Sequence, residues 1–136
     1  MTERLLQFIW QFQYFNRQLL TLESGEPFEI IHPGSPNTNQ GPDFLEARIR
    51  IDNTVWAGHV ELHIKASDWR KHGHAEDRNY SNVMLHVVWE NDLADAAGNI
   101  PVFSLRDRVP KILLQQYEDW LNNGQFIPCG RQARTV

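Results

Sequence analysis

Residues 44–65 read FLEARIRIDNTVWAGHVELHIK, and this stretch predicts two antiparallel strands joined by a tight turn. Apolar and polar side chains alternate from Phe44 to Ile51 and again from Val55 to Lys65, which is the period of a half-buried strand. Asp52-Asn53 falls between the two runs and predicts the hairpin turn. The alternation predicts inward side chains at Leu45, Ala47, Ile49, Ile51, Val60, Leu62 and Ile64, and outward ones at Glu46, Arg48, Arg50, His59, Glu61, His63 and Lys65.

Further elements are expected on both sides of this hairpin. Residues 3–22 predict an amphipathic helix with Thr2 as its N-cap, and residues 27–31 a short strand. Three Pro and two Gly make 32–42 an irregular segment that delivers Asp43 to the hairpin. The patterns then predict a short helix with a loop over 67–82, a central strand over 83–89 and a short strand over 102–105. The last predicted element is a helix over 110–122. Its apolar residues are expected to form one buried stripe of Ile112, Leu113, Tyr117, Trp120 and Leu121.

This order of elements predicts an α+β fold, or a three-layer α/β fold. A mixed sheet of about four to six strands is expected to lie between an N-terminal and a C-terminal helix. A chain of 136 residues fits one domain, expected over 1–128. Residues 129–136 are expected to form a disordered or truncated tail, and the chain to be an N-terminal fragment of a longer protein.

Composition limits the class of protein. The net charge of −4 argues against nucleic-acid binding through bulk charge, yet six of the thirteen basic residues cluster between positions 48 and 78. The single Cys129 excludes an internal disulfide and fits a reducing compartment. We find neither a signal peptide nor an apolar run of the roughly 18 residues that a membrane span needs, so a cytoplasmic protein without membrane contact is expected.

Acidic side chains occur where the strands of the hairpin are expected to be neighbours. Asp43 precedes the first strand and Glu61 lies within the second. Two carboxylates that converge in this way are the hard oxygen ligands that Mg²⁺ or Mn²⁺ takes in phosphodiester hydrolysis. His63 or Lys65, on the same face as Glu61, would orient the attacking water or stabilise the transition-state charge. Phosphate contacts are expected from Arg48, Arg70 and Lys71.

This layout resembles the PD-(D/E)xK nuclease superfamily, whose core runs helix, three strands, helix, strand. Pro42-Asp43 matches the first part of its motif. Glu61-Leu62-His63 matches the second, with His in place of Lys, and Lys65 would be a displaced lysine. The resemblance implies a restriction-endonuclease-like core and a metal-dependent nuclease activity.

A second resemblance covers nearly the whole chain. The sequence is similar to the DUF2851 family of bacterial proteins, which is common in Bacteroidetes, has no assigned function and has considerably longer members. This resemblance implies no activity. It is carried by four runs, Gly41-Pro42-Asp43-Phe44, Trp56-Ala57-Gly58-His59-Val60-Glu61-Leu62-His63, Ser67-Asp68-Trp69 and Asn82-Val83-Met84-Leu85-His86-Val87-Val88.

Histidines suggest a second metal site. His72 and His74, separated by Gly73, could bind Zn²⁺ with Asp77 or Glu76 as a third ligand, although a polar surface loop explains them as well. His86 lies in the apolar strand 83–89, where it is either a hydrogen-bonded core residue or a neighbour of the metal site. Glu61 and His63 have their own alternative, a strand face that simply meets water.

Two classes of function are therefore expected. The first is a Mg²⁺- or Mn²⁺-dependent phosphodiesterase acting on nucleic acid, with Asp43, Glu61, His63 and Lys65 at its centre. The second is a non-catalytic interaction module, with or without a His-based Zn²⁺ site. In that module the aromatic and His-rich faces dock a missing C-terminal domain, a partner chain or a second copy. A close approach of the Asp43 and Glu61 carboxylates would favour the phosphodiesterase, and a wide separation would favour the interaction module.

Overall fold

The computed structural model describes residues 1–71, 80–92 and 100–123. Their elements follow one another from an N-terminal helix, through a sheet, to a C-terminal helix. These elements are α1 (Glu3–Gln11), β1 (Phe28–His32), β2 (Ser35–Pro36), β3 (Phe44–Ile51), β4 (Thr54–Lys65), α2 (Asp68–Lys71), β5 (Val83–Glu90), β6 (Val102–Ser104), the 3-10 helix η3 (Arg106–Arg108) and α3 (Lys111–Asn123).

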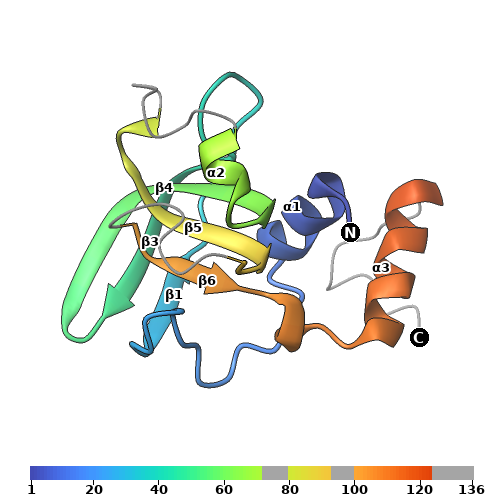
Figure 1. Cartoon of the computed structure of the whole chain (residues 1–136), viewed down its shortest axis with the longest axis horizontal. Coiled ribbons are helices and arrows are strands. Elements are labelled where there is room, and N and C mark those ends of the chain that lie inside the picture. Colours follow the sequence, from blue (N-terminus) through green and yellow to red (C-terminus); the bar gives the residue numbers. More distant parts are fainter. Residues whose placement is uncertain (72–79, 93–99, 124–136) are drawn as a thin grey trace.

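The strands form one mixed, curled sheet, so the predicted α+β class is confirmed. The strand order is β1-β3-β4-β5-β6, and β2 pairs with β3 at its start. Neighbours from β1 to β4 are antiparallel, whereas β4-β5 and β5-β6 are parallel. Parallel neighbours need a crossover connection, and α2 lies in the connection from β4 to β5. Figure 1 shows α1 against the sheet and α3 beside α1.

The core lies between α1 and the sheet. The Thr2 side chain accepts a hydrogen bond from the amide of Leu5 and caps α1, as predicted. Leu6, Ile9 and Trp10 on this helix are fully buried. They pack with the inward side chains of the strands in one cluster, which includes Phe44, Ile49, Val60, Leu62, Leu85, Val87 and Phe103. This packing fixes α1 against the strands that carry the acidic residues.

The first helix is shorter than predicted, because it ends at Gln11 instead of continuing to residue 22. Gln13 adopts a positive φ of 56° and donates its amide to the Trp10 carbonyl, so the chain turns away from the helix axis. The turn lets Tyr14 stack on Tyr117 and Phe15 stack on Trp10, with ring centroids 5.2 Å and 6.1 Å apart. Aromatic packing against the core therefore replaces the helical periodicity that the sequence suggested.

A β-bulge changes the predicted alternation in β3. Phe44 pairs with Val60, but Ala47 pairs with Gly58, so β3 holds one residue more than β4 over this interval. Both Phe44 and Ala47 are consequently buried, and the predicted inward position Leu45 is only half-buried. The turn at Asp52, with a φ of 54°, is where the sequence placed it.

The segment 32–42 contains a short strand that the sequence did not predict. Gly34 has a φ of 96°, and a Cβ there would lie 3.0 Å from the carbonyl oxygen of Leu45. Only glycine allows this close approach, which lets β2 pair with the start of β3. This part of the prediction is wrong, although the segment does deliver Asp43 to β3.

The C-terminal helix is present, but only the Tyr117, Trp120 and Leu121 part of its predicted buried stripe packs on the core. Tyr117 is its one buried side chain, whereas Ile112 is 81% exposed and Leu113 is also exposed. The helix packs on α1, and its Leu114, Trp120 and Leu121 are partly buried against the core. Among the residues that the structure describes, no helix combines the length and apolar character that crossing a membrane requires.

Candidate functional site: a carboxylate pair beside two buried histidines

Asp43 and Glu61 meet where β3 begins beside β4. The amide of Asp43 donates to Oε1 of Glu61 over 3.2 Å. In return, the Oδ2 atom of Asp43 accepts the amide of Leu62 over 2.8 Å. This reciprocal arrangement follows from the antiparallel pairing of Phe44 with Val60, which places the residues beside them at one level of the sheet. These two bonds hold the carboxyl groups of Asp43 and Glu61 close enough to interact electrostatically.

The Glu61 carboxyl group holds a proton at neutral pH. Burial raises its pKa most, and the negative charge of Asp43 together with the hydrogen bond between the two side chains raises it further, to about 9. The Glu61 side chain is only 4% exposed, whereas Asp43 is half-buried. The pair therefore has one deeply buried member and one member that reaches the surface.

Gln7 connects the first helix to this pair. Its Nε2 atom donates to Oδ1 of Asp43 over 3.0 Å, so both oxygens of Asp43 accept a hydrogen bond. Sequence reasoning missed Gln7, because nothing distinguishes it from the other glutamines of the same segment, Gln11 and Gln13. Its role depends on how α1 docks on β4, which the sequence alone does not specify.

Two histidines extend the site into the protein interior. The Nε2 atom of His63 lies 3.4 Å from Oε2 of Glu61, and its Nδ1 atom lies 2.8 Å from Nε2 of His86. The indole of Trp69, on α2, packs on both imidazoles with centroid separations of 6.3 Å and 5.1 Å. The alternative of a water-facing strand surface is therefore wrong for Glu61 and His63, because α2 covers this face and leaves His63 1% exposed.

Lys65 is not brought to the carboxylate pair. It is exposed at the last position of β4, four residues beyond Glu61. At the usual rise of a strand, this spacing corresponds to roughly 13 Å along the backbone. His63, and not Lys65, is the residue of β4 that lies next to Glu61.

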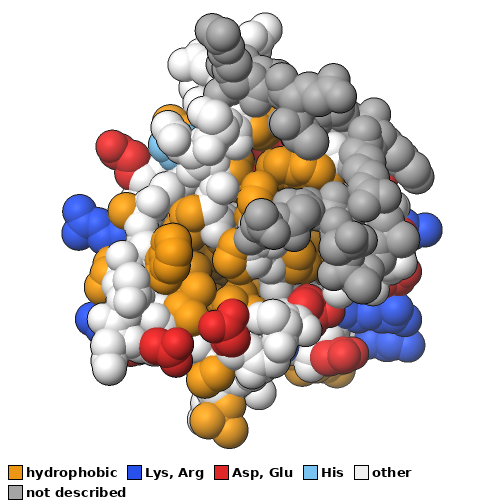
Figure 2. Space-filling model, turned by 60° about the vertical axis from the view of Figure 1, so that its left-hand side comes forward, with side chains coloured by type: hydrophobic (Ala, Val, Ile, Leu, Met, Phe, Trp, Pro, Cys, Tyr) orange, Lys and Arg blue, Asp and Glu red, His pale blue; other side chains and the backbone are white. Residues whose placement is uncertain are grey.

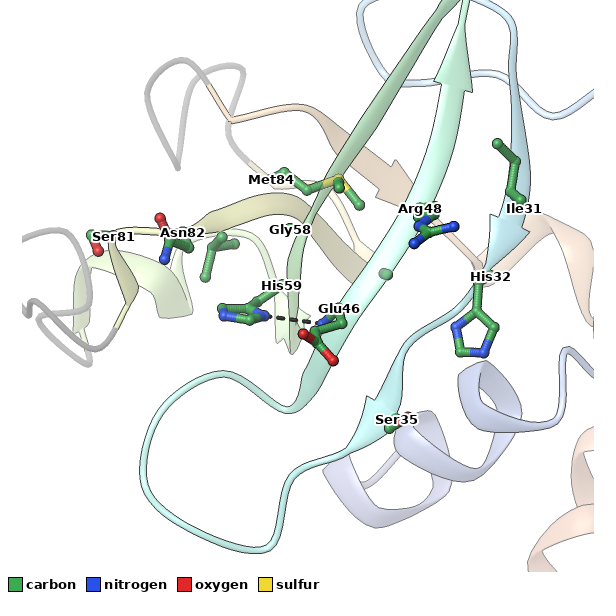
Figure 3. A pocket seen from close by; sticks show the side chains of 13 residues that line it. Ile31, His32, Ser35, Glu46, Arg48, Gly58, His59, Ser81, Asn82 and Met84 are labelled. Atoms are coloured by element: carbon green, nitrogen blue, oxygen red, sulfur yellow. Dashed lines mark hydrogen bonds between the residues drawn. The ribbon is translucent and has the colours of Figure 1, made fainter.

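The other residues predicted for the site either lie away from Asp43 and Glu61 or fall outside the residues that the structure describes. Arg48 is exposed on β3 and lines a surface cavity of about 870 Å³, drawn in Figure 3. Arg70 and Lys71 belong to α2. His72, His74 and Asp77 lie outside the described residues, as does Cys129. Within the described ranges, no cluster of three or more His, Cys, Asp and Glu side chains is arranged to hold a metal ion.

Comparison with known families identifies the chain by sequence. The model of the family described as "Protein of unknown function (DUF2851)" matches residues 3–136. The chain therefore belongs to this family, and the resemblance carried by its four sequence runs is confirmed. Comparisons with curated proteins and with solved structures give no match.

Proposed function

We propose that this chain is a divalent-metal-dependent phosphodiesterase domain that acts on nucleic acid. The observation that carries the proposal is the contact between Asp43 and Glu61, which neighbouring strands bring together and which two reciprocal hydrogen bonds to backbone amides hold in place. Apart from the two-residue β2, the described elements from α1 to β5 run helix, three strands, helix, strand, the core order of the PD-(D/E)xK superfamily that the motif resembles. Order and motif support the same class of enzyme.

The chemistry of the donor atoms fits Mg²⁺ or Mn²⁺. These cations take oxygen ligands and often bind to a protein through only one or two carboxylates, with water and substrate phosphate in the other positions. Asp43 and Glu61 would supply the two carboxylates. A bound cation would stabilise charge on the phosphoryl oxygens and on the leaving oxygen of the substrate.

His63 would take part in removing the proton from the Glu61 carboxyl group. Glu61 must lose its proton before its carboxylate can hold a cation, and the nearest imidazole nitrogen lies 3.4 Å away. Because His63 is buried, it would act through Glu61 and not on the substrate directly, by relaying the proton that Glu61 releases to solvent and keeping the carboxylate oriented. Lys65, exposed at the end of β4, would contact substrate phosphates outside the pair.

The test is Mn²⁺ titration by calorimetry together with cleavage of a labelled oligonucleotide. The proteins are wild type, D43N and E61Q, with D107N as a control that removes an exposed carboxylate on η3. The proposal predicts that Mn²⁺ binding and cleavage are lost in D43N and E61Q and kept in D107N. Unchanged Mn²⁺ binding in both D43N and E61Q would refute it.

The second candidate function is a non-catalytic interaction module. Exposed apolar side chains favour it, among them Trp56, which is 51% exposed. Figure 2 shows a face of the molecule on which apolar side chains gather at the surface. Sedimentation of the wild type and of Trp56→Ser over a range of concentrations tests association with a second copy, which the substitution would weaken. Metal-independent association without cleavage would support this candidate over the phosphodiesterase.

A further inference from the structure

The cavity of about 870 Å³ lies on the strand face that also carries Glu61 and His63. Residues of β1, β2, β3, β4 and the start of β5 line it, together with the segment that leads into β5. His59 lines the cavity and lies two residues before Glu61 on β4. Because alternate residues of a strand share a face, these two side chains are neighbours at roughly 6.5 Å along the strand. The carboxylate pair does not itself line the cavity, and His59 is the cavity residue of β4 closest to it along the strand.

Two histidines of the cavity are fixed as hydrogen-bond donors. The Nδ1 atom of His59 accepts the amide of Glu46 over 3.1 Å, and the Nδ1 atom of His32 accepts the amide of Gly34 over 3.0 Å. A neutral imidazole whose Nδ1 accepts a hydrogen bond carries its proton on Nε2. In both rings the remaining polar position is consequently an N–H group, which suits an anionic oxygen.

The β-bulge of β3 creates the first of these hydrogen bonds. Glu46 occupies the bulge with a φ of 57°, a conformation that non-glycine residues adopt infrequently. In this conformation its amide donates to a side chain of β4 instead of to a backbone carbonyl. Bulges commonly redirect groups beside functional sites, and here the bulge fixes the His59 ring.

Charge and apolar surface complete the cavity. Arg48 provides a positively charged guanidinium group, and Glu46 provides one carboxylate of opposite charge. In Figure 3 the His59 ring lies against Glu46, with the side chains of Arg48 and His32 on neighbouring strands. Ile31 and Met84 add apolar surface. Fixed N–H donors and a guanidinium group recognise phosphate, whereas apolar side chains recognise the face of a sugar or base.

We infer that this cavity binds the backbone of a single nucleic-acid strand next to the phosphodiester that reaches Asp43 and Glu61. The inference rests on the proposed function and specifies its substrate as single-stranded nucleic acid. Arg48, His59 and His32 contact the phosphates that flank the reacting one. A cavity of about 870 Å³ is at the upper end of the size range for small-ligand sites, enough for a short stretch of one strand.

The experiment measures binding of a fluorescent oligothymidylate by anisotropy in EDTA, so that neither metal binding nor cleavage contributes. R48A and H59Q are compared with R50A, which removes the same charge from the same strand face two positions away. Arg50 pairs with Glu29 over 2.8 Å and does not line the cavity. We expect R48A to weaken binding about tenfold and to reduce the slope of log K against log salt by about 0.7. H59Q is expected to weaken binding also, R50A to leave it unchanged and E46Q to strengthen it.

Equal effects of R48A and R50A would overturn the inference, because the binding would then depend on bulk charge. Absence of oligothymidylate binding by the wild type would overturn it as well. Displacement of the oligonucleotide by thymidine monophosphate at equal concentration would indicate that the cavity binds a single phosphate. This result would contradict binding of a nucleic-acid strand. Binding without any Mn²⁺-dependent cleavage would refute the proposed activity and leave this inference standing. Cleavage that R48A does not affect would refute this inference alone.

Discussion

Asp43 and Glu61 lie eighteen residues apart in the sequence, yet each fixes the position of the other. The amide of Asp43 donates to the Glu61 carboxyl group, and the Asp43 carboxylate accepts the amide next to Glu61. The negative charge of Asp43 raises the pKa of the Glu61 carboxyl group, and Gln7 and His63 occupy the outer sides of the pair. Under the proposed function, this pair would be an acid in the absence of a cation and would bind the cation in its presence.

Stability should fall as pH rises, because the pKa of Glu61 is raised from 4.5 to about 9 in the folded protein. Below pH 4.5 both folded and unfolded states hold this proton. Between about 4.5 and 9 only the folded state holds it, so the free energy of unfolding decreases with pH, and above 9 the contribution is lost. Urea unfolding of the wild type and E61Q at pH 5, 7 and 9 tests this, with E29Q as the control.

We expect a smaller pH dependence in E61Q than in the wild type and in E29Q. Asp43, Glu3 and His63 also surround this group, and they remain in the E61Q protein. These neighbours are present in all three proteins, so the difference between the curves reports on the removal of Glu61. Superimposable pH profiles of the wild type and E61Q would show that Glu61 ionises normally.

The two buried histidines should be energetically coupled. His63 and His86 share a hydrogen bond of 2.8 Å, and each is at most 1% exposed. Replacing one by Leu leaves a buried ring nitrogen without this bond, at a cost of about 1–3 kcal/mol. We expect H63L and H86L each to be destabilised by this amount and the double variant by less than the sum. Strict additivity in urea unfolding would contradict the coupling.

Gly58 should not tolerate a side chain. A Cβ at this position would lie 2.6 Å from Cγ of Met84 and 2.8 Å from the backbone oxygen of Asn82. G58A should therefore cost about 1–3 kcal/mol of folding free energy. M84A in the same protein would relieve only the first clash, so the double variant should remain less stable than M84A alone. Equal midpoints of thermal unfolding for M84A and the double variant would refute this close packing.

The C-terminal helix should respond to mutation at its single buried position. Tyr117 contacts Phe8 and Tyr14 with centroid separations of 6.1 Å and 5.2 Å, so Y117A should cost about 3–5 kcal/mol. Ile112, which is exposed, should tolerate Ser within about 0.5 kcal/mol. Urea unfolding would contradict this account of α3 if I112S were destabilised as strongly as Y117A.

Local patterns predicted much of the sheet and little of what surrounds it. Alternation located β3 and β4 because a strand with one buried face has a strict period of two, and Asp52 marked their turn. The end of α1 was missed because Tyr14 and Phe15 pack against residues from distant parts of the sequence. The exposure of Ile112 was missed for a related reason, since an apolar stripe does not reveal which surface it meets.

The candidate site likewise has contacts that the sequence predicted and contacts that it did not. The hairpin predicted that Asp43 and Glu61 lie near each other, but the register in which they face each other depends on the β-bulge between Phe44 and Ala47. The contact between His63 and His86 depends on the parallel register of β4 with β5, in which Glu61 pairs with His86. The β-bulge at Glu46 and the contact of Gln7 leave no signal in the sequence, because both arise from how elements pack.

The most direct test of the central claim is the number of protons released when Mn²⁺ binds. Calorimetric titrations at pH 7 in buffers of different ionisation enthalpy measure this number. Because Glu61 is protonated before the cation binds, we predict release of about one proton per Mn²⁺ by the wild type. We predict no specific binding by E61Q. Mn²⁺ binding without proton release, or equal binding by E61Q, would contradict a metal site at Asp43 and Glu61.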